Sequence, residues 1–298
     1  MPRSPLRRHE RSTFFKYCTA TTAKAVLAGG RLRWSSPLIF NDPFDVPLEL
    51  AYSFSPQEII LAALAKCVAL VEEPPSNTER LTPKLRAIVE AIKGGLPDSE
   101  RRRIIELFKS EAGTAKPVGV GLRQLGELWK QLLPELRILC LCESPSHVAM
   151  WHHYADQYRG VVLELACDDR LDSAWLGAVP VTYRDSGNPL AEVDTWANLL
   201  VLETSEAVTD LTHLSAYFKS SDWSYEREWR LLSYKREQEA GYFSDYRFDP
   251  EELLGVYLGP RMDSGTASEI SLLTEHYPRA KVFRTNIGLG PRLTFSDA

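Results

Sequence analysis

Two stretches of this chain concentrate the side-chain types that do chemistry. The first, residues 150–160, reads MWHHYADQYRG, and the second, residues 219–230, reads KSSDWSYEREWR. Aromatic rings provide flat surfaces for planar ligands, and paired carboxylates provide charge stabilisation or acid–base catalysis. We therefore expect the functional site to lie where the two stretches meet, with Tyr154 facing Glu228 across one pocket.

The second stretch contains two closely spaced carboxylates. If residues 224–232 form a strand, alternate side chains share a face, so Glu226, Glu228 and Arg230 lie together with the carboxylates about 7 Å apart. Such a pair suits an acid site in which one group binds a substrate hydroxyl and the other stabilises developing positive charge. The pattern equally fits a salt-bridged strand in which Arg230 neutralises Glu228, and the sequence leaves both interpretations open.

Three aromatic residues of the first stretch have helical spacing. Trp151, Tyr154 and Tyr158 are three or four residues apart and can line one helix face. They would either stack on a planar ligand, such as a nucleobase or nicotinamide, or pin the helix to a sheet. Tyr154 is the better site candidate because its hydroxyl needs a partner if it is buried.

Cysteines and histidines near the first stretch do not predict a metal site. Cys140, Cys142, His147, His152 and His153 are close in sequence, but their spacing does not match the usual zinc-binding patterns. We therefore expect no metal.

The loop of residues 41–45, NDPFD, has the composition of a turn. Alternatively it is a polar loop over the pocket, in which Asn41 or Asp42 contacts the ligand. The chain has no P-loop, Rossmann fingerprint, nucleophile elbow or zincin motif, so these nucleotide-binding and hydrolase classes have no support.

The composition, with 44% hydrophobic and 25% charged residues, is that of a soluble globular protein. No apolar run approaches the roughly 20 residues that a membrane span needs, so no membrane partner is expected. Five cysteines without a secretory signal favour reduced thiols and a cytoplasmic location. A net charge of −5 argues against indiscriminate nucleic-acid coating, although it allows a local basic groove.

Hydrophobic periodicity and turn signals predict an α+β fold with a mixed or split β-sheet core and a helical insertion. We expect a basic, solvated N-terminal tail at 1–12, a core domain formed by 13–54 and 136–298, and the insertion at 55–135. Strands are predicted at 14–17, 32–35, 137–142, 160–165, 179–183, 217–218, 224–234, 254–259 and 280–285. Helices are predicted at 21–27, 55–71, 82–92, 98–108, 122–132 and 190–206.

Four ordered motifs together resemble one family. They are the aromatic-Lys-Tyr strand at 15–17, the NDPFD loop at 41–45, the MWHHYA block at 150–155 with its following glycine, and the late motif at 219–230. This set resembles the bacterial domain-of-unknown-function family 2971, sometimes labelled abortive-phage-infection proteins. The resemblance implies a role in phage defence and leaves the chemistry open.

A looser likeness is to the ADP-ribosyltransferase superfamily. The order of Lys16-Tyr17, Gly30-Arg31-Leu32, Tyr154 and the Glu226–Glu228 pair is similar to that of these enzymes. The chain departs from the superfamily in its first strand, where Lys16 stands in place of His or Arg. It also departs in lacking a clear Ser-Thr-Ser strand.

This second resemblance implies that NAD is the substrate. Glu228 would stabilise an oxocarbenium-like ribose, and Glu226 would assist it or orient the acceptor. The remaining residues would bind NAD. The aromatic residues would stack on nicotinamide, namely Tyr17, Trp151 and Tyr154. The basic residues Lys16 and Arg230 would hold phosphate or ribose, and Asn41 would also contact the ligand.

The expected function is therefore a cytoplasmic, NAD-dependent ADP-ribosyltransferase-like effector that acts in phage defence or as a toxin. Its partners would be a nucleotide and a protein or nucleic-acid acceptor. The alternative is a non-enzymatic sensor module of a defence system that binds a nucleotide, a peptide or nucleic acid. A nuclease is a weaker possibility because the sequence shows no carboxylate cluster for metal binding.

Overall fold

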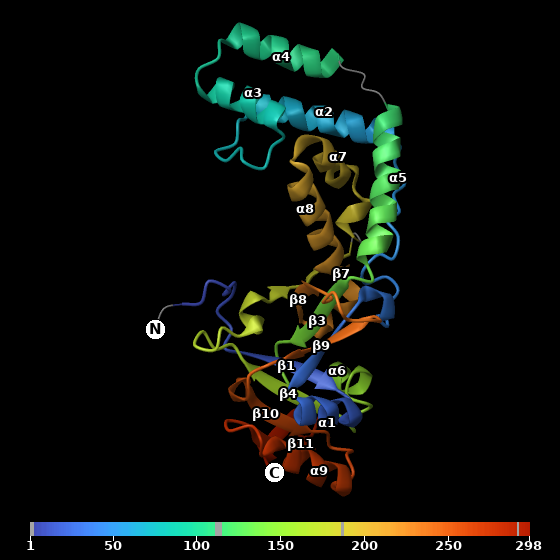
Figure 1. Cartoon of the computed structure of the whole chain (residues 1–298), viewed down its shortest axis with the longest axis vertical. Coiled ribbons are helices and arrows are strands. Elements are labelled where there is room, and N and C mark those ends of the chain that lie inside the picture. Colours follow the sequence, from blue (N-terminus) through green and yellow to red (C-terminus); the bar gives the residue numbers. More distant parts are fainter. Residues whose placement is uncertain (1–2, 111–114, 186–187, 291) are drawn as a thin grey trace. The chain divides into compact units, whose positions relative to one another are not determined.

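The computed structural model describes residues 3–110, 115–185, 188–290 and 292–298 (Figure 1). The chain divides into two compact units. The sheet unit comprises Met1–Asp42, Leu133–Tyr183 and Lys219–Ala298, and the helical unit comprises Pro43–Leu132 and Arg184–Phe218. The insertion predicted for 55–135 lies in the helical unit as far as Leu132, and that unit also takes up residues 43–54 and 184–218.

The sheet unit is built on a sheet of ten strands among the described residues. Its strands are β1 (Thr13–Cys18), β2 (Arg31–Ser35), β3 (Leu136–Cys142), β4 (Val161–Ala166), β5 (Val179–Pro180), β8 (Glu228–Tyr234), β9 (Phe243–Arg247), β10 (Leu253–Leu258), β11 (Lys281–Ile287) and β12 (Leu293–Asp297). A separate two-stranded sheet pairs β6 (Thr182–Arg184) with β7 (Phe218–Ser220).

The large sheet runs in the order β12-β11-β10-β4-β1-β3-β2-β9, and it divides at β3. One edge of β3 is shared, with Cys142 opposite Phe15 of β1 and Ile138 opposite Ser35 of β2. The other edge pairs along its whole length with β8. Because β10 and β11 are parallel while the other pairs are antiparallel, the predicted α+β class with a mixed sheet is confirmed.

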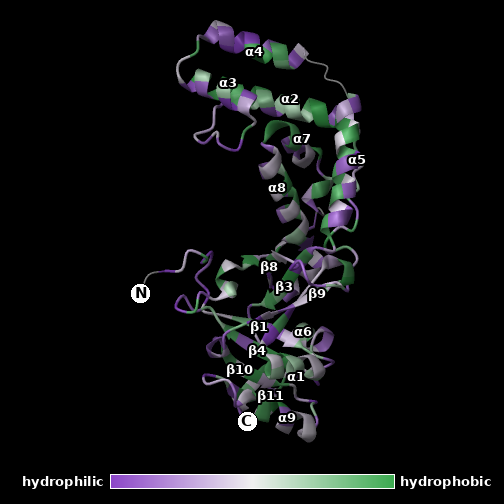
Figure 2. Cartoon of the chain, in the orientation of Figure 1, coloured by the Kyte–Doolittle hydropathy of each residue, from purple (hydrophilic) through white to green (hydrophobic). Residues whose placement is uncertain are grey.

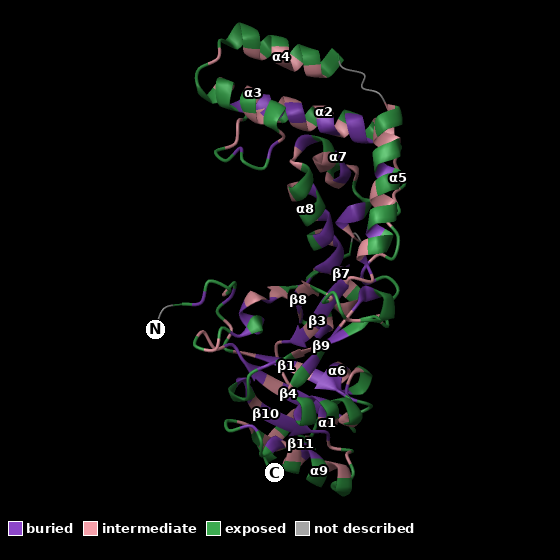
Figure 3. Ribbon diagram, in the orientation of Figure 1, coloured by how far each residue is buried: buried purple, intermediate pink, exposed green. Residues whose placement is uncertain are grey.

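Helices cover both faces of this sheet, which is why its central strands are almost continuously apolar (Figures 2 and 3). Successive residues of a strand point to opposite faces, so Phe14 packs with α1 (Ala20–Gly29) and α9 (Ser264–Thr274). Phe15 and Tyr17 pack on the other face against α6 (Val148–His153), around Trp151. The second chemically rich stretch, residues 219–230, contacts α6 on this face of the sheet.

The helical unit contains α2 (Pro56–Glu72), α3 (Pro83–Lys93), α4 (Asp98–Ser110), α5 (Ala115–Leu132), α7 (Val193–Val201) and α8 (Thr204–Ala216). α2 begins with a capping box in which the Ser55 and Glu58 side chains bond each other's backbone amides. The single helix predicted for 190–206 is wrong. Leu202 leaves the helix to bridge Leu81, and α8 starts afresh beyond it. None of the helices in the described ranges combines the length and apolar character that crossing a membrane requires.

The N-terminal segment is packed onto the sheet unit and is not a loose, solvated tail. The Arg7 guanidinium forms an ion pair with Asp169 at 2.6 Å. The buried His9 ring bonds the Trp175 carbonyl at 2.8 Å. Part of the positive charge of this basic segment is therefore neutralised within the fold.

A tight turn after α6 fixes the first stretch of the motif. The helix ends at His153, and Asp156, Gln157 and Tyr158 adopt positive φ angles of 45°, 49° and 72°. Tyr158 therefore does not share a helix face with Trp151, and the predicted three-residue aromatic face is wrong. Gly160 closes the turn, and a Cβ there would lie 2.3 Å from the Cys18 carbonyl oxygen.

Replacing Gly160 by Ala should destabilise the fold, because the added methyl meets backbone atoms that cannot move aside independently. We expect a loss of about 1–3 kcal/mol in the free energy of unfolding, measured by urea denaturation. Gly126→Ala is the matched control, since its Cβ would meet open space within α5. That control should be neutral or slightly stabilising. Equal stability of the Gly160 variant and the wild type would contradict the packing of this turn.

Candidate functional site

The two chemically rich stretches meet on the α6 face of the sheet unit. The Tyr154 hydroxyl donates a hydrogen bond to Glu226 Oε1 at 2.7 Å. Around this contact lie Lys219, Glu228 and Arg230, and we call these five residues the charged cluster. All five belong to the sheet unit.

Lys219 lies between the two carboxylates of the charged cluster. Its Nζ is 2.6 Å from Glu226 Oε2 and 3.4 Å from Glu228 Oε2. The Trp223 ring lies 4.8 Å from the same ammonium, at cation–π distance. Lys219 therefore forms ion pairs with both Glu226 and Glu228.

Arg230 binds Glu228 through two parallel hydrogen bonds. Its Nε donates to Oε1 at 2.7 Å, and its Nη2 donates to Oε2 at 3.0 Å. This bidentate geometry fixes the orientation of the carboxylate as well as its charge. The salt bridge between Arg230 and Glu228 that the sequence allowed is therefore present in the structure.

The backbone around the carboxylates differs from the predicted strand. Ser221–Glu226 forms a 3-10 turn, η4, and Arg227 adopts a left-handed conformation with φ 45° and ψ 53°. β8 starts only at Glu228, so the 7 Å strand spacing does not apply to Glu226. From Glu228 onward the alternation holds, and Glu228 and Arg230 stand opposite Cys142 and Cys140 of β3. The turn at Arg227 is what directs both carboxylates to one lysine.

Burial makes the two carboxylates electrostatically different. Glu226 is 1% exposed and Glu228 is 5% exposed. Burial raises the pKa of Glu226 above its ordinary value, despite the opposing charge of Lys219. Burial also acts to raise the pKa of Glu228, but the charge and hydrogen bonds of Arg230, together with Lys219, outweigh it and lower that pKa to about 2. Glu228 is therefore anionic at neutral pH, and Glu226 is the better proton acceptor.

Trp151 and Tyr17 lie in the core beside the charged cluster. Trp151 is fully buried, and its Nε1 donates to the Pro145 carbonyl at 2.7 Å. Its ring meets Tyr17 edge-on at 5.7 Å, and the Tyr17 hydroxyl donates to the Ser144 carbonyl. These two rings belong to the same packed cluster as Tyr154, a half-buried aromatic residue that contacts Glu226.

The remaining predicted binding residues lie outside the charged cluster. Lys16 Nζ donates to the Cys140 backbone carbonyl at 2.9 Å. Asn41 is exposed in the loop that follows η1 (Pro37–Ile39). Of the predicted set, Tyr154 is hydrogen-bonded to Glu226 and Arg230 to Glu228 within the charged cluster, while Tyr17 and Trp151 contact each other in the core.

Sequence reasoning missed three residues that contact Glu226 or Glu228. Lys219 belongs to the same motif, and its position seven residues before Glu226 was a usable signal. The Tyr183 hydroxyl accepts a hydrogen bond from the Glu228 amide at 2.9 Å, and Cys140 bonds the Glu228 side chain. No local pattern around Tyr183 or Cys140 identified either residue.

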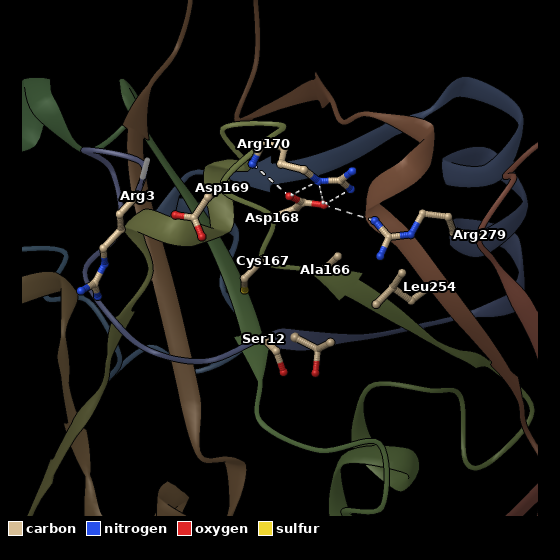
Figure 4. A pocket seen from close by; sticks show the side chains of 10 residues that line it. Arg3, Ser12, Ala166, Cys167, Asp168, Asp169, Arg170, Leu254 and Arg279 are labelled. Carbon is tan, nitrogen blue, oxygen red and sulfur yellow. Dashed lines mark hydrogen bonds and ion pairs between the residues drawn. The ribbon is translucent and has the colours of Figure 1, made fainter. Parts of the chain in front are cut away.

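A separate polar pocket of about 610 Å³ lies elsewhere in the sheet unit (Figure 4). Asp168 accepts from Arg170 at 2.6 Å and from Arg279 at 3.3 Å across this pocket. No residue of the two chemically rich stretches is among those that line this pocket, so we place the candidate chemistry in the charged cluster. Within the described ranges, no three His, Cys, Asp or Glu side chains are grouped so that they could hold a metal ion.

One family model matches part of the chain. The model of the family described as "Protein of unknown function (DUF2971)" matches residues 150–231, which span both chemically rich stretches. The predicted resemblance to this family is therefore confirmed for that segment. No curated protein and no solved structure matches the chain.

The lowered pKa of Glu228 predicts that the free energy of unfolding decreases at acid pH. A carboxyl whose folded pKa lies near 2 and whose ordinary value is 4.5 stabilises the fold above pH 4.5. That contribution, about 3 kcal/mol, is lost as the pH falls from 4.5 toward 2. Glu228→Gln should therefore be less stable than wild type at pH 7, and the gap should close at low pH in urea titrations.

Glu226→Gln should show the opposite trend, because the pKa of Glu226 is raised and its ionised form is disfavoured in the fold. Its stability relative to wild type should be greatest at neutral pH and should fall as the pH is lowered. Glu275→Gln, on the exposed end of α9, is the control and should leave the pH profile unchanged. Parallel profiles for both glutamine variants would contradict the assigned asymmetry.

Proposed function

We propose that this chain, whose residues 150–231 carry the DUF2971 segment, is an NAD-dependent ADP-ribosyltransferase-like effector. The observation that supports the proposal is the carboxylate pair Glu226–Glu228, held by one lysine while its two pKa values are shifted in opposite directions. Pairs whose environments separate their pKa values are typical of acid–base sites.

The chemistry of NAD cleavage matches these two carboxylates. When the ribose–nicotinamide C–N bond breaks, nicotinamide leaves with the bonding electrons, and the ribose develops oxocarbenium character as in glycoside cleavage. Anionic Glu228, fixed by Arg230, would stabilise that positive charge. Glu226, oriented by Tyr154, would accept the proton of the incoming acceptor nucleophile. The acceptor is a protein or nucleic-acid group.

The cluster is covered in the present conformation, and η4 carries both Glu226 and the Trp223 ring that lies over Lys219. Substrate would therefore enter by displacing part of η4. Tyr154 is then the aromatic surface for nicotinamide, with Trp151 and Tyr17 packed behind it. The proposed setting is the cytoplasm, which the cysteine content favours. The proposed role is in phage defence, as the family resemblance implies, or as a toxin.

A second candidate function rests on the charge balance of the cluster. Glu226 and Glu228 are matched by Lys219 and Arg230, and all four side chains are at most 5% exposed. A buried network of paired charges also suits a non-enzymatic sensor that binds a nucleotide without cleaving it.

The decisive measurement is release of nicotinamide from NAD by the purified chain, with NAD binding followed in parallel by calorimetry. Glu228→Gln should lower the rate of release about 10²–10³-fold, the usual effect of removing one transition-state charge contact. Glu226→Gln should lower transfer to an acceptor more than hydrolysis. Circular dichroism confirms that each variant is folded before its activity is compared.

The matched control is Glu164→Gln, because Glu164 also accepts a tyrosine hydroxyl, from Tyr257 at 2.7 Å, but lies outside the cluster. Its activity should equal that of the wild type. Binding of NAD without nicotinamide release would favour the sensor. Full activity of Glu228→Gln would eliminate the proposed role of this carboxylate.

A further inference from the structure

A second charged surface lies on the paired strands β2 and β9, away from the charged cluster. Strand alternation buries Leu32 and Trp34 in the core and leaves Arg31 and Arg33 exposed on the opposite side. On β9 the residues opposite them are Arg247 and Asp245.

The register of this ladder places two arginines directly against each other. Arg31 pairs with Arg247, whereas Arg33 pairs with Asp245 and forms an ion pair with it at 3.1 Å. Like charges directly opposite on a sheet repel. Among the described residues, neither the Arg31 nor the Arg247 guanidinium has a hydrogen-bond or ion-pair partner, and both residues are exposed. An anion from outside the chain would relieve this repulsion.

A groove adjoins Arg31 and Arg33. It has a volume of about 540 Å³, and its polar lining comes from these two arginines, from Thr21 and Thr22 of α1, and from Asp245, which is paired with Arg33. Guanidinium and hydroxyl groups are common donors to phosphate oxygens. The face carries three arginines and one aspartate in a chain whose net charge is −5, so it is a local exception to the overall charge.

An exposed aromatic side chain lies further along the same face. Phe243 stands opposite Ser35, is 42% exposed, and has the Arg33 guanidinium 3.7 Å from its ring centroid. Tyr242 next to it is 48% exposed. From Arg31 to Ser35 the strand advances about 13 Å, which is too far for one nucleotide to span with a single phosphate and base. Unpaired bases stack on such rings, whereas paired bases in a duplex do not reach them.

We propose that this arginine face, formed by Arg31, Arg33, Arg247 and Phe243, binds single-stranded nucleic acid. The phosphates lie on Arg31 and Arg247 and enter the groove beside α1, while a base stacks on the part of the Phe243 ring that Arg33 leaves exposed. The site uses none of the charged-cluster residues, so it stands or falls independently of NAD cleavage. If both hold, the bound strand is a candidate acceptor or activating signal for the cluster.

The test is fluorescence anisotropy with a labelled 12-nucleotide oligouridine and the corresponding oligothymidine, over a range of salt concentrations. Arg31→Ala/Arg247→Ala should weaken binding at least about tenfold at low salt. It should also reduce the slope of log affinity against log salt by about 1.4, since each phosphate contact on a single strand contributes about 0.7. Arg8→Ala/Arg159→Ala removes the same charge from two other exposed arginines and should leave both quantities unchanged.

Phe243→Ala separates base stacking from charge. It should weaken binding about 5- to 150-fold, the value of one stacked base, and should leave the salt slope unchanged. Absence of oligonucleotide binding by the wild type, or equal losses in both double-arginine variants, would overturn the proposal. Tighter binding to a blunt hairpin duplex than to the single strand would also overturn it. So would full competition by inorganic polyphosphate together with normal binding by Phe243→Ala, because an anion site without base recognition would explain that combination.

Discussion

The arrangement of the candidate site depends on one interaction, the Lys219 ammonium shared between Glu226 and Glu228. Two carboxylates this deeply buried repel each other and lose their hydration, so they remain together only with a cation between them. Removing one partner of such a buried network typically costs about 3–5 kcal/mol, because the remaining charges are left without a partner. Lys219, at 2.6 and 3.4 Å from the two carboxylates, therefore allows both to stay buried side by side.

The sheet supplies the fixed half of this site, and a turn supplies the adjustable half. Glu228 and Arg230 belong to β8, which is paired along its length with β3, so their positions follow from the ladder register. Glu226 belongs to η4 and is joined to β8 only through the left-handed Arg227. Non-glycine residues rarely adopt this conformation, and they keep it only where surrounding contacts compensate. The contacts of Glu226 with Lys219 and Tyr154 provide that compensation.

This division also explains what the sequence could and could not predict. The central strands and α2 carry their signals locally, as alternating or continuous apolar runs and as the Ser55 capping box. The break between α7 and α8 at Leu202 arises from pairing with Leu81, more than a hundred residues away, and no local pattern announces it. Tyr183 reaches Glu228 in the same way, through tertiary structure alone.

The carboxylate motif shows the same limit at the level of a few residues. Period-two spacing correctly placed Glu228 and Arg230 on one face, because β8 is extended there. It failed one residue earlier, since neither η4 nor the positive φ of Arg227 has a glycine or asparagine to signal it. Pairing of charges decided the local backbone, and that information lies in the contacts with Lys219 and Tyr154.

The two charged surfaces of the sheet unit solve opposite electrostatic problems. In the charged cluster, each carboxylate has a cation within 3 Å and almost no exposure to water, so the fold itself balances the charge. On the arginine face, Arg31 and Arg247 are placed opposite each other in water, where repulsion is weak enough to tolerate without a partner. An acidic residue at either position would stabilise the folded state more than this like-charged pair does. The arginine pair therefore suits binding of an external anion. The exposed ring of Phe243 beside it favours an anion that carries bases.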